Sequence, residues 1–396
     1  MQIPEQIRRR HADHTAWRHH IHAHPELAYE EKATSDFVAE KLRGFGLEVH
    51  RGLGVTGVVG TLSSGESGRA IGLRADMDAL PIRELNEFEH RSRHEGRMHA
   101  CGHDGHTAML LGAAEHLAAH PDFDGTVHFI FQPAEEGRAG AKAMIDDGLF
   151  ELFPMEAVYG MHNWPGLPVG QFAVRTGAQM AASDKFEIVV RGRGGHAAMP
   201  DQTIDPVLTA AHIVTALQSL ASRNTEPTDS VVVSVTVVQG GETFNVIPDE
   251  VTLRGTARTL TPESRDRVEQ GISRVASAVA EAFGASADTR YFRTYPPTVN
   301  TAAEAEIAAR AAAAVVGNDN VHRDLPPTMG GEDFAFMLQE KPGCYLWIGN
   351  GPGEGGCMLH NARYDFNDEA LPVGVAYWAS LVAGILGPDA DTARSA

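Results

Sequence analysis

The chain has 396 residues and a formal net charge of −19, with 43% hydrophobic residues and only three cysteines. This length exceeds one ordinary core, so two domains are expected. The negative charge argues against nucleic acid and anionic membranes as partners. The few cysteines argue against a disulfide framework and favour a reducing, cytoplasmic setting. We see no signal peptide in the charged N-terminal segment and no apolar run of membrane-spanning length.

The first 178 residues predict an alternation of helices and strands. Predicted helices cover residues 3–22, 31–44, 107–120 and 139–147. Predicted strands, which are apolar or β-branched, cover residues 55–62, 70–75, 126–131 and 158–164. Such an alternation is typical of an α/β layer structure.

The pattern changes near Met180. Strands are predicted over 185–191, 230–239, 250–258 and 287–294, and helices over 206–220 and 262–283, with Asp205 and Thr261 as N-caps. This β-α-β-β-α-β order is that of ferredoxin-like domains. We therefore predict an inserted domain over 179–295 and a discontinuous first domain over 1–178 and 296–396. The latter regains helices at 302–316 and 371–386 and a strand at 345–348.

The densest group of metal-binding side chains lies between His99 and His106, where one thiol and three imidazoles fall within eight residues. Thiolates and neutral imidazoles bind borderline transition metals such as zinc. Cys101 and His103 flank Gly102, which lets both side chains converge on one point. The alternative is a histidine-rich surface loop in a chain that has 20 histidines.

Further candidate ligands follow or end apolar strands. Glu135 and Glu136 come after the 126–131 strand, His162 lies near the end of the 158–164 strand, and His360 follows the 345–348 strand. One glutamate can bind a metal while its neighbour accepts a proton, although a solvated turn is the alternative for this pair. Open α/β sheets place their sites at such strand ends.

Taken together, ordered motifs between His22 and Asn361 resemble the M20 metallopeptidase family. The resemblance is to its amidohydrolase branch of hippurate hydrolases, bacterial N-acyl-amino-acid amidohydrolases and plant indole-acetyl-amino-acid hydrolases. The matching stretches are 22–27 (HAHPEL), 74–81 (RADMDALP), 98–106 (MHACGHDGH), 131–137 (FQPAEEG), 160–162 (GMH), 192–200 (GRGGHAAMP), 245–248 (NVIP), 329–334 (MGGEDF) and 360–361 (HN).

The resemblance implies two divalent metal ions per subunit (Zn, Mn, Ni or Co) and Glu135 as general base. The implied ligands are Cys101, His103, Glu136, His162 and His360. More distant M20 peptidases carry His-x-Asp where this chain has Asp76-Met77-Asp78, and they lack the Cys-Gly-His pair. We therefore do not expect Asp76 to be a ligand, and we expect Asp78 to orient a ligand, unless it is only a cap.

Within the insert, the resemblance implies that His196 donates to the oxyanion, often at the partner subunit's metal site; a surface-turn histidine is the alternative. Asn245 either binds substrate or fixes its own turn. Arg258 is the candidate for binding a substrate carboxylate through two parallel hydrogen bonds, with Arg254 as its competitor. Glu332 would lie in a loop near the metals, or be structural.

The implied function is hydrolysis of N-acyl amino acids, such as N-acetyl or N-benzoyl (hippurate-like) compounds, to a carboxylic acid and a free amino acid. There are two alternatives: a dipeptidase or carboxypeptidase on the same scaffold, and a non-catalytic binding homologue. The insert would serve as a lid and dimerisation domain. Its valine-rich strand 230–239 could pair with a second copy, giving a homodimer, with a tetramer as the alternative.

Two other patterns are discounted. Residues 52–57 match G-x-G-x-x-G, but the sequence continues as a strand, whereas dinucleotide binding requires a helix there. His20, His22 and His24 resemble a second metal cluster, for which local structure before the His24-Pro25 break is the preferred explanation.

Overall fold

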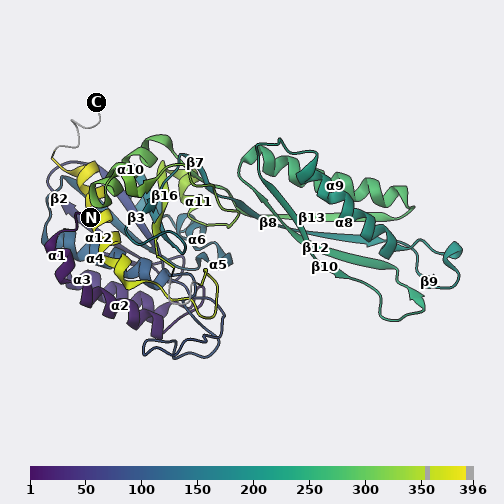
Figure 1. Ribbon diagram of the computed structural model, residues 1–396, viewed down its shortest axis with the longest axis horizontal. Coiled ribbons are helices and arrows are strands. Elements are labelled where there is room, and N and C mark those ends of the chain that lie inside the picture. The colour runs from purple at the N-terminus through teal and green to yellow at the C-terminus, as the bar shows by residue number, and fades with distance from the viewer. Residues whose placement is uncertain (353–356, 389–396) are drawn as a thin grey trace. The chain divides into compact units, whose positions relative to one another are not determined.

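The computed structural model describes residues 1–352 and 357–388. The chain divides into two compact units (Figure 1). Unit 1 comprises Met1–Gln179, Val299–Pro326 and Asp333–Ala396, and unit 2 comprises Met180–Thr298 and Pro327–Glu332. The segment Pro327–Glu332 thus groups with unit 2, whereas the sequence analysis assigned it to the first domain.

Unit 1 is built on an eight-stranded mixed sheet with the strand order β1-β2-β4-β3-β5-β16-β6-β15. Its strands are β1 (Glu48–Leu53), β2 (Gly57–Ser64), β3 (Ala70–Asp76), β4 (Gly125–Gln132), β5 (Ala157–Trp164), β6 (Phe172–Ala173), β15 (Val321–His322) and β16 (Gly343–Gly349). The four central strands, β4, β3, β5 and β16, are mutually parallel. Their carboxyl ends therefore share one edge of the sheet, where α/β proteins place their sites.

Helices cover the sheet of unit 1 on both faces. They are α1 (Glu5–Arg9), α2 (His11–Ala23), α3 (Lys32–Gly44), α4 (His103–Ala119), α5 (Glu135–Arg138), α6 (Gly140–Asp146), α7 (Leu149–Leu152), α10 (Ala302–Val316), α11 (Ala335–Glu340) and α12 (Leu371–Leu386), with 3-10 turns at Asn318–Asn320 and Asp368–Ala370. Helix α12 packs against both α4 and α10, while α4 packs against β3 and α10 against β16. On the other face, Arg74 of β3 lies over Phe334, which precedes α11.

Helix α12 is unusually apolar for a helix of this length. Residues Asp368–Leu386 form a segment long and apolar enough to cross a membrane, which the sequence analysis overlooked. In the structure 72% of an 18-residue stretch of this segment is buried, in the core that α12 shares with α4 and α10. This burial is that of a core helix.

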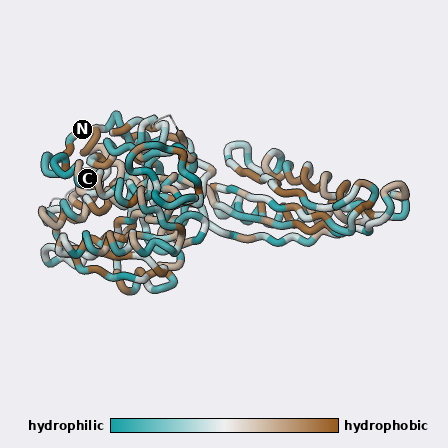
Figure 2. Tube along the Cα trace, turned by 90° about the horizontal axis from the view of Figure 1, so that it is seen from below, coloured by the Kyte–Doolittle hydropathy of each residue, from teal (hydrophilic) through white to brown (hydrophobic). Residues whose placement is uncertain are grey.

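Unit 2 contains a four-stranded antiparallel sheet with the strand order β10-β12-β8-β13. Its main elements are β8 (Ala182–Arg191), α8 (Pro206–Ser222), β10 (Val231–Gln239), β12 (Glu250–Thr259), α9 (Pro262–Ala282) and β13 (Ser286–Tyr295). The shorter ones are β9 (Gly195–His196), β11 (Val246–Ile247) and a 3-10 turn at Pro200–Gln202, while β7 (Gly177–Met180) and β14 (Thr298–Asn300) lie where the chain passes between units. Apolar and polar residues mix along the strands of this unit (Figure 2).

The two helices of unit 2 pack on its sheet through one apolar core. The predicted N-caps are confirmed, because the Asp205 side chain accepts from the Val207 and Leu208 amides and Thr261 accepts from Ser264. The sheet order and the βαββαβ sequence of elements are those of a ferredoxin-like unit. The predicted fold class, an α/β unit with a mixed sheet plus a ferredoxin-like unit, is confirmed.

Three elements of unit 1 differ from those predicted from the sequence. The N-terminal helix is interrupted at Arg10, which separates α1 from α2. Helix α4 begins at His103 rather than at residue 107, so the metal-binding motif forms its first turn. Strand β1 was not predicted, since it is an edge strand with mostly exposed residues. It pairs with β2 in a hairpin, so a strand and no helix follows residues 52–57.

Candidate metal centre

The Cys-Gly-His motif sits where the chain enters α4. Gly102 has φ +95°, and a Cβ at this position would lie 2.2 Å from Oδ1 of Asn163. Only glycine fits such a position without displacing a neighbour. Gly102 therefore allows Cys101 and His103 to stand close to the end of β5, which carries His162.

The paired glutamates occupy a strained turn after β4. Ala134 has φ +56°, and Glu136 has non-helical backbone angles although it lies within α5. A non-glycine residue in this region costs about 1–3 kcal/mol and persists only where the surroundings enforce it. Buried Glu31 does so here, because its Oε1 accepts the Ala134 amide at 2.9 Å. Glu135 and Glu136 each place a carboxylate oxygen within 4.8 Å of the other and of a ring nitrogen of His103.

Unit 1 brings all five predicted ligands together. The Cys101 sulfur lies 3.4 Å from Nε2 of His162, and Nε2 of His360 lies 3.2 Å from Oε1 of Glu136. Ligand atoms lie within 4.8 Å of one another in three overlapping groups, namely Cys101/His103/His162, Cys101/Glu136/His360 and His103/Glu135/Glu136. The separate motifs of the sequence thus form one contiguous cluster.

Asp78 organises this cluster through its backbone and its carboxylate. Nδ1 of His103 lies 2.9 Å from the Asp78 carbonyl oxygen, and the Asp78 carboxylate accepts the amides of Glu135 at 3.1 Å and Glu136 at 2.9 Å. In the neutral ring of His103 the Nδ1–H therefore donates, and Nε2 keeps a lone pair. That Nε2 is buried without a hydrogen-bond partner, whereas Oε1 of Glu136 faces Nε2 of His360.

Asp76 and His106 lie beside the cluster but bind each other. Oδ1 of Asp76 accepts from Nδ1 of His106 at 2.6 Å, and its Oδ2 accepts from Arg74 at 2.7 Å. Nε2 of His106 accepts the Asn163 amide at 3.0 Å. Both carboxylate oxygens of Asp76 thus already have protein partners.

The electrostatics of the cluster favour a cation. Burial lowers the pKa of His103, but Asp76 and Asp78 outweigh it and raise that pKa to about 10. Burial and the carboxylate of Glu136 raise the pKa of the Cys101 thiol well above its ordinary value. Burial holds the pKa of His162 well below its ordinary value, so this ring is neutral. The site therefore has an excess of carboxylates over positive charges.

The predicted residues of the insert fall at two places in unit 2. His196 pairs with Val246 between β9 and β11, and the Asn245 carbonyl accepts the Ala197 amide at 3.0 Å, so His196 and Asn245 are neighbours. Both are exposed. Nδ1 of His196 accepts the Ala198 amide at 3.1 Å, which leaves Nε2–H of the neutral ring as a free donor.

Arg258 and its competitor Arg254 differ in their partners. Arg254 is exposed and paired with Glu187 at 2.8 Å. Arg258 is half-buried at the other end of β12 and donates to Thr256 and to the Ala257 carbonyl; no ion pair of it is found in unit 2, which is described throughout. Burial lowers the pKa of Arg258. Glu332 is buried, and its carbonyl accepts from Thr298 at 3.4 Å.

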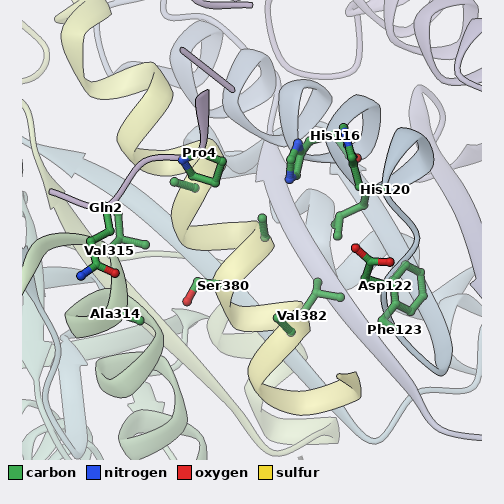
Figure 3. Close-up of a pocket in the computed structure, with 14 residues that line it drawn as sticks. Gln2, Pro4, His116, His120, Asp122, Phe123, Ala314, Val315, Ser380 and Val382 are labelled. Atoms are coloured by element: carbon green, nitrogen blue, oxygen red, sulfur yellow. The ribbon is translucent and has the colours of Figure 1, made fainter. Parts of the chain in front are cut away.

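A pocket of about 280 Å³ lies at the far end of α4 (Figure 3). His116, His120 and Asp122 gather at one end of it, and Gln2 and Val315 line the other. Helix α4 spans 17 residues from His103, or about 25 Å. This pocket is therefore separate from the ligand cluster.

Sequence reasoning missed several buried charges around the cluster, among them Glu31, Arg74 and Arg18. For Arg18, the helical spacing of its neighbours could have indicated that it is buried. It falls between His14 and His22 at a spacing of four residues, on the face of α2 that also buries Trp17 and Ile21. Glu31 and Arg74 carry no comparable signal in the local pattern.

Comparisons with known proteins agree with this geometry. The family model for peptidase family M20/M25/M40 matches residues 72–384. The hippurate hydrolase of Campylobacter jejuni is 43% identical over 364 residues, covering 92% of this chain and 94% of the relative. The N-acetylcysteine deacetylase of Bacillus subtilis is 41% identical over 375 residues, covering 93% and 96%. A crystal structure of a Bacillus subtilis dinuclear metal binding peptidase from the M20 family superposes with a TM-score of 0.84 at 36% identity, covering 96% of this chain and 99% of that one.

Proposed function

The chain belongs to peptidase family M20/M25/M40 and is an M20-type metallo-amidohydrolase, and we propose that it cleaves the amide bond of N-acyl amino acids. The observation that carries this proposal is the ligand cluster around His103, to which the adjacent carboxylates of Glu135 and Glu136 both contribute an oxygen. The names of two relatives, hippurate hydrolase and N-acetylcysteine deacetylase, support the class of substrate. The acyl group and the amino acid are left open.

Two divalent ions, drawn from zinc, manganese, nickel or cobalt, would be held by Cys101, His103, Glu136, His162 and His360. The buried, unpartnered Nε2 of His103 supports this fit, as does the mixed sulfur, nitrogen and oxygen donor set. When bound, such ions lower the pKa of water and polarise a carbonyl group. Asp78 would keep His103 in the tautomer that presents Nε2.

Glu135 is proposed as the general base. Its carboxylate would take a proton from the attacking water and later deliver it to the leaving nitrogen. Its position is supported by the Asp333 amide, 3.4 Å from its Oε1, and by Asp78, which accepts its own amide. A positioned acid/base of this kind contributes about 10²–10⁴-fold.

Several residues of unit 2 are proposed to act on the substrate. The Nε2–H of His196 is proposed to donate to the developing oxyanion, with Asn245 as its neighbour on the substrate. Arg258 is proposed to bind the α-carboxylate, since Arg254 is already paired with Glu187. Glu332 is proposed to be a substrate-side residue near the metals, although its burial equally suits a structural role.

We further propose that His196 serves the site of a second copy. His196 follows β8, whose start at Ala182 lies next to the point where the chain enters unit 2; nine residue steps along this strand span about 30 Å. Strand β10 is an edge strand on which Val237 and Val238 are exposed, and such an edge invites pairing with another copy. A cytoplasmic homodimer is the proposed form, in keeping with a chain that has only three cysteines.

The activity is tested with N-acetyl amino acids, N-benzoyl amino acids and dipeptides, after loading the protein with Mn²⁺ or Zn²⁺. Turnover that is fastest with an N-acyl amino acid supports the proposal. Faster cleavage of dipeptides would favour the peptidase alternative, and no turnover by fully metallated protein would favour a binding homologue.

The role of the second copy is tested by mixing two inactive variants, Glu135→Gln and His196→Ala. In a mixed dimer one site has an intact Glu135 and receives an intact His196 from the other chain. Activity should therefore return after subunit exchange. No recovery, with mixed dimers present, would contradict action between copies.

A further inference from the structure

Helix α2 carries a buried charge cluster that the proposed chemistry does not use. Arg18 is fully buried, and its guanidinium contacts three carboxylates, those of Asp104 at 3.3 Å, Asp365 at 2.8 Å and Asp368 at 3.2 Å. A buried arginine requires such partners, because burial of an unpaired charge is strongly unfavourable. These three carboxylates come from two separate parts of the chain, α4 and the segment before α12.

His22, one turn after Arg18 on α2, joins the same cluster. Its Nδ1 lies 2.8 Å from Oδ2 of Asp104, and its Nε2 lies 3.2 Å from Oε1 of Glu84. Glu84 in turn accepts the Ser92 amide at 2.6 Å. Both ring nitrogens of His22 therefore have protein partners, which accounts for this histidine without a second metal site.

The carboxylates that Arg18 holds are close in sequence to two proposed ligands. Asp104 directly follows His103, and Asp365 lies five residues after His360. His360 has φ +63°, and its amide donates to the Ala100 carbonyl at 2.7 Å. A non-glycine residue stays in this conformation only where its surroundings hold it. Fixing Asp365 fixes the far end of the segment that carries His360.

We propose that Arg18 and His22 are positioning residues of the metal centre. Arg18 joins the start of α4 to the segment after His360, so that His103 and His360 stay at the spacing at which both can bind ions. His22 contacts the same carboxylate oxygen of Asp104 as Arg18 does. The inference rests on the proposed function, since it assumes that these histidines are ligands. Removing partners of this kind lowers metal affinity about 10–100-fold.

The chain offers a matched control on the same pair of helices. Arg10, next to the start of α2, binds Glu115 of α4 at 2.6 Å. Glu115 lies eleven residues after Asp104, or about 16 Å further along α4. Arg10→Met therefore breaks a contact of the same kind far from the ligands.

The test measures Zn²⁺ affinity by competition with a chromogenic chelator, and the visible spectrum of the Co²⁺-loaded protein. We expect Arg18→Met to weaken at least one bound ion about 10–100-fold and to change the Co²⁺ bands, with Arg18→Lys recovering part of the loss. Arg10→Met should match the wild type in both readouts. Wild-type Zn²⁺ affinity and Co²⁺ spectrum in folded Arg18→Met would overturn the proposal.

If Arg18→Met does not fold, Asp368→Asn provides the test. This change weakens one contact of Arg18 at a partly exposed carboxylate and leaves Asp104 and Asp365 in place. A several-fold loss of Zn²⁺ affinity supports the proposal, and unchanged affinity contradicts it. Failure of the proposed function can be distinguished from failure of this inference, because in the former case the wild-type protein itself would bind no Zn²⁺.

Discussion

Each unit buries a charged cluster, and the two clusters differ in whether their polar atoms are satisfied. In unit 2, Oδ1 of Asp184 accepts from Arg265 at 2.6 Å and from the Thr294 amide at 3.0 Å. Its Oδ2 accepts from Arg265 at 2.8 Å and from Tyr291 at 2.9 Å. Every lone pair of this buried carboxylate is used within the unit.

The cluster around His103 in unit 1 is different. Nε2 of His103 is buried without a hydrogen-bond partner, and four carboxylates surround the ring, those of Asp76, Asp78, Glu135 and Glu136. Unsatisfied buried groups are costly unless they serve a ligand. The comparison indicates that the closed cluster stabilises its unit, whereas the open one is a binding site.

Glu135→Gln should have the largest effect. The amide cannot take up a proton, so kcat is expected to fall about 10²–10⁴-fold. Two ions should remain bound, because Glu135 is not in the proposed ligand set. Rates with an N-acyl amino acid and metal content by plasma emission check both statements. Near-normal turnover would remove Glu135 from the mechanism.

Cys101→Ala should lower the metal content of the protein, which tests whether the open cluster is the binding site. Loss of a thiolate ligand is expected to reduce the ions retained after dialysis to fewer than two per chain. Cys344→Ala is the control, since this thiol is equally buried but lies in β16 away from the cluster. Equal metal content in the two variants would exclude Cys101 as a ligand.

Asp184→Asn tests the closed cluster. Weakening a buried ion pair is expected to cost about 3–5 kcal/mol in free energy of unfolding, because Arg265 loses its charged partner. Metal content should stay at the wild-type value. Denaturant unfolding and elemental analysis measure the two effects, and a change in metal content without a loss of stability would reverse the assignment of the two clusters.

His128 gives the smallest effect, in the stability of unit 1 toward acid. Burial lowers its pKa to about 4, below the ordinary 6.5, so the unfolded chain binds a proton in that range and the folded one does not. Stability should therefore fall by about 3 kcal/mol as the pH drops from 6.5 to 4. His128→Asn keeps an acceptor for Thr61 and should reduce this slope in urea unfolding. An unchanged slope would show that His128 is not responsible.

Most of the fold follows from local pattern, because helices such as α8 and α9 have caps and apolar faces that their own residues determine. The polar edge strand β1 lacks such a pattern and was missed. The separate motifs predicted the ligand cluster because each contains ligand-type side chains. Arg18, Glu31 and Arg74 were missed because a buried charge differs from an exposed one only through partners distant in sequence.

Anomalous diffraction from crystals grown with Zn²⁺, recorded at the zinc absorption edge, tests the central claim most directly. The account predicts two peaks per chain, bounded by Cys101, His103, Glu136, His162 and His360. No anomalous density within that cluster in crystals holding Zn²⁺ would contradict it.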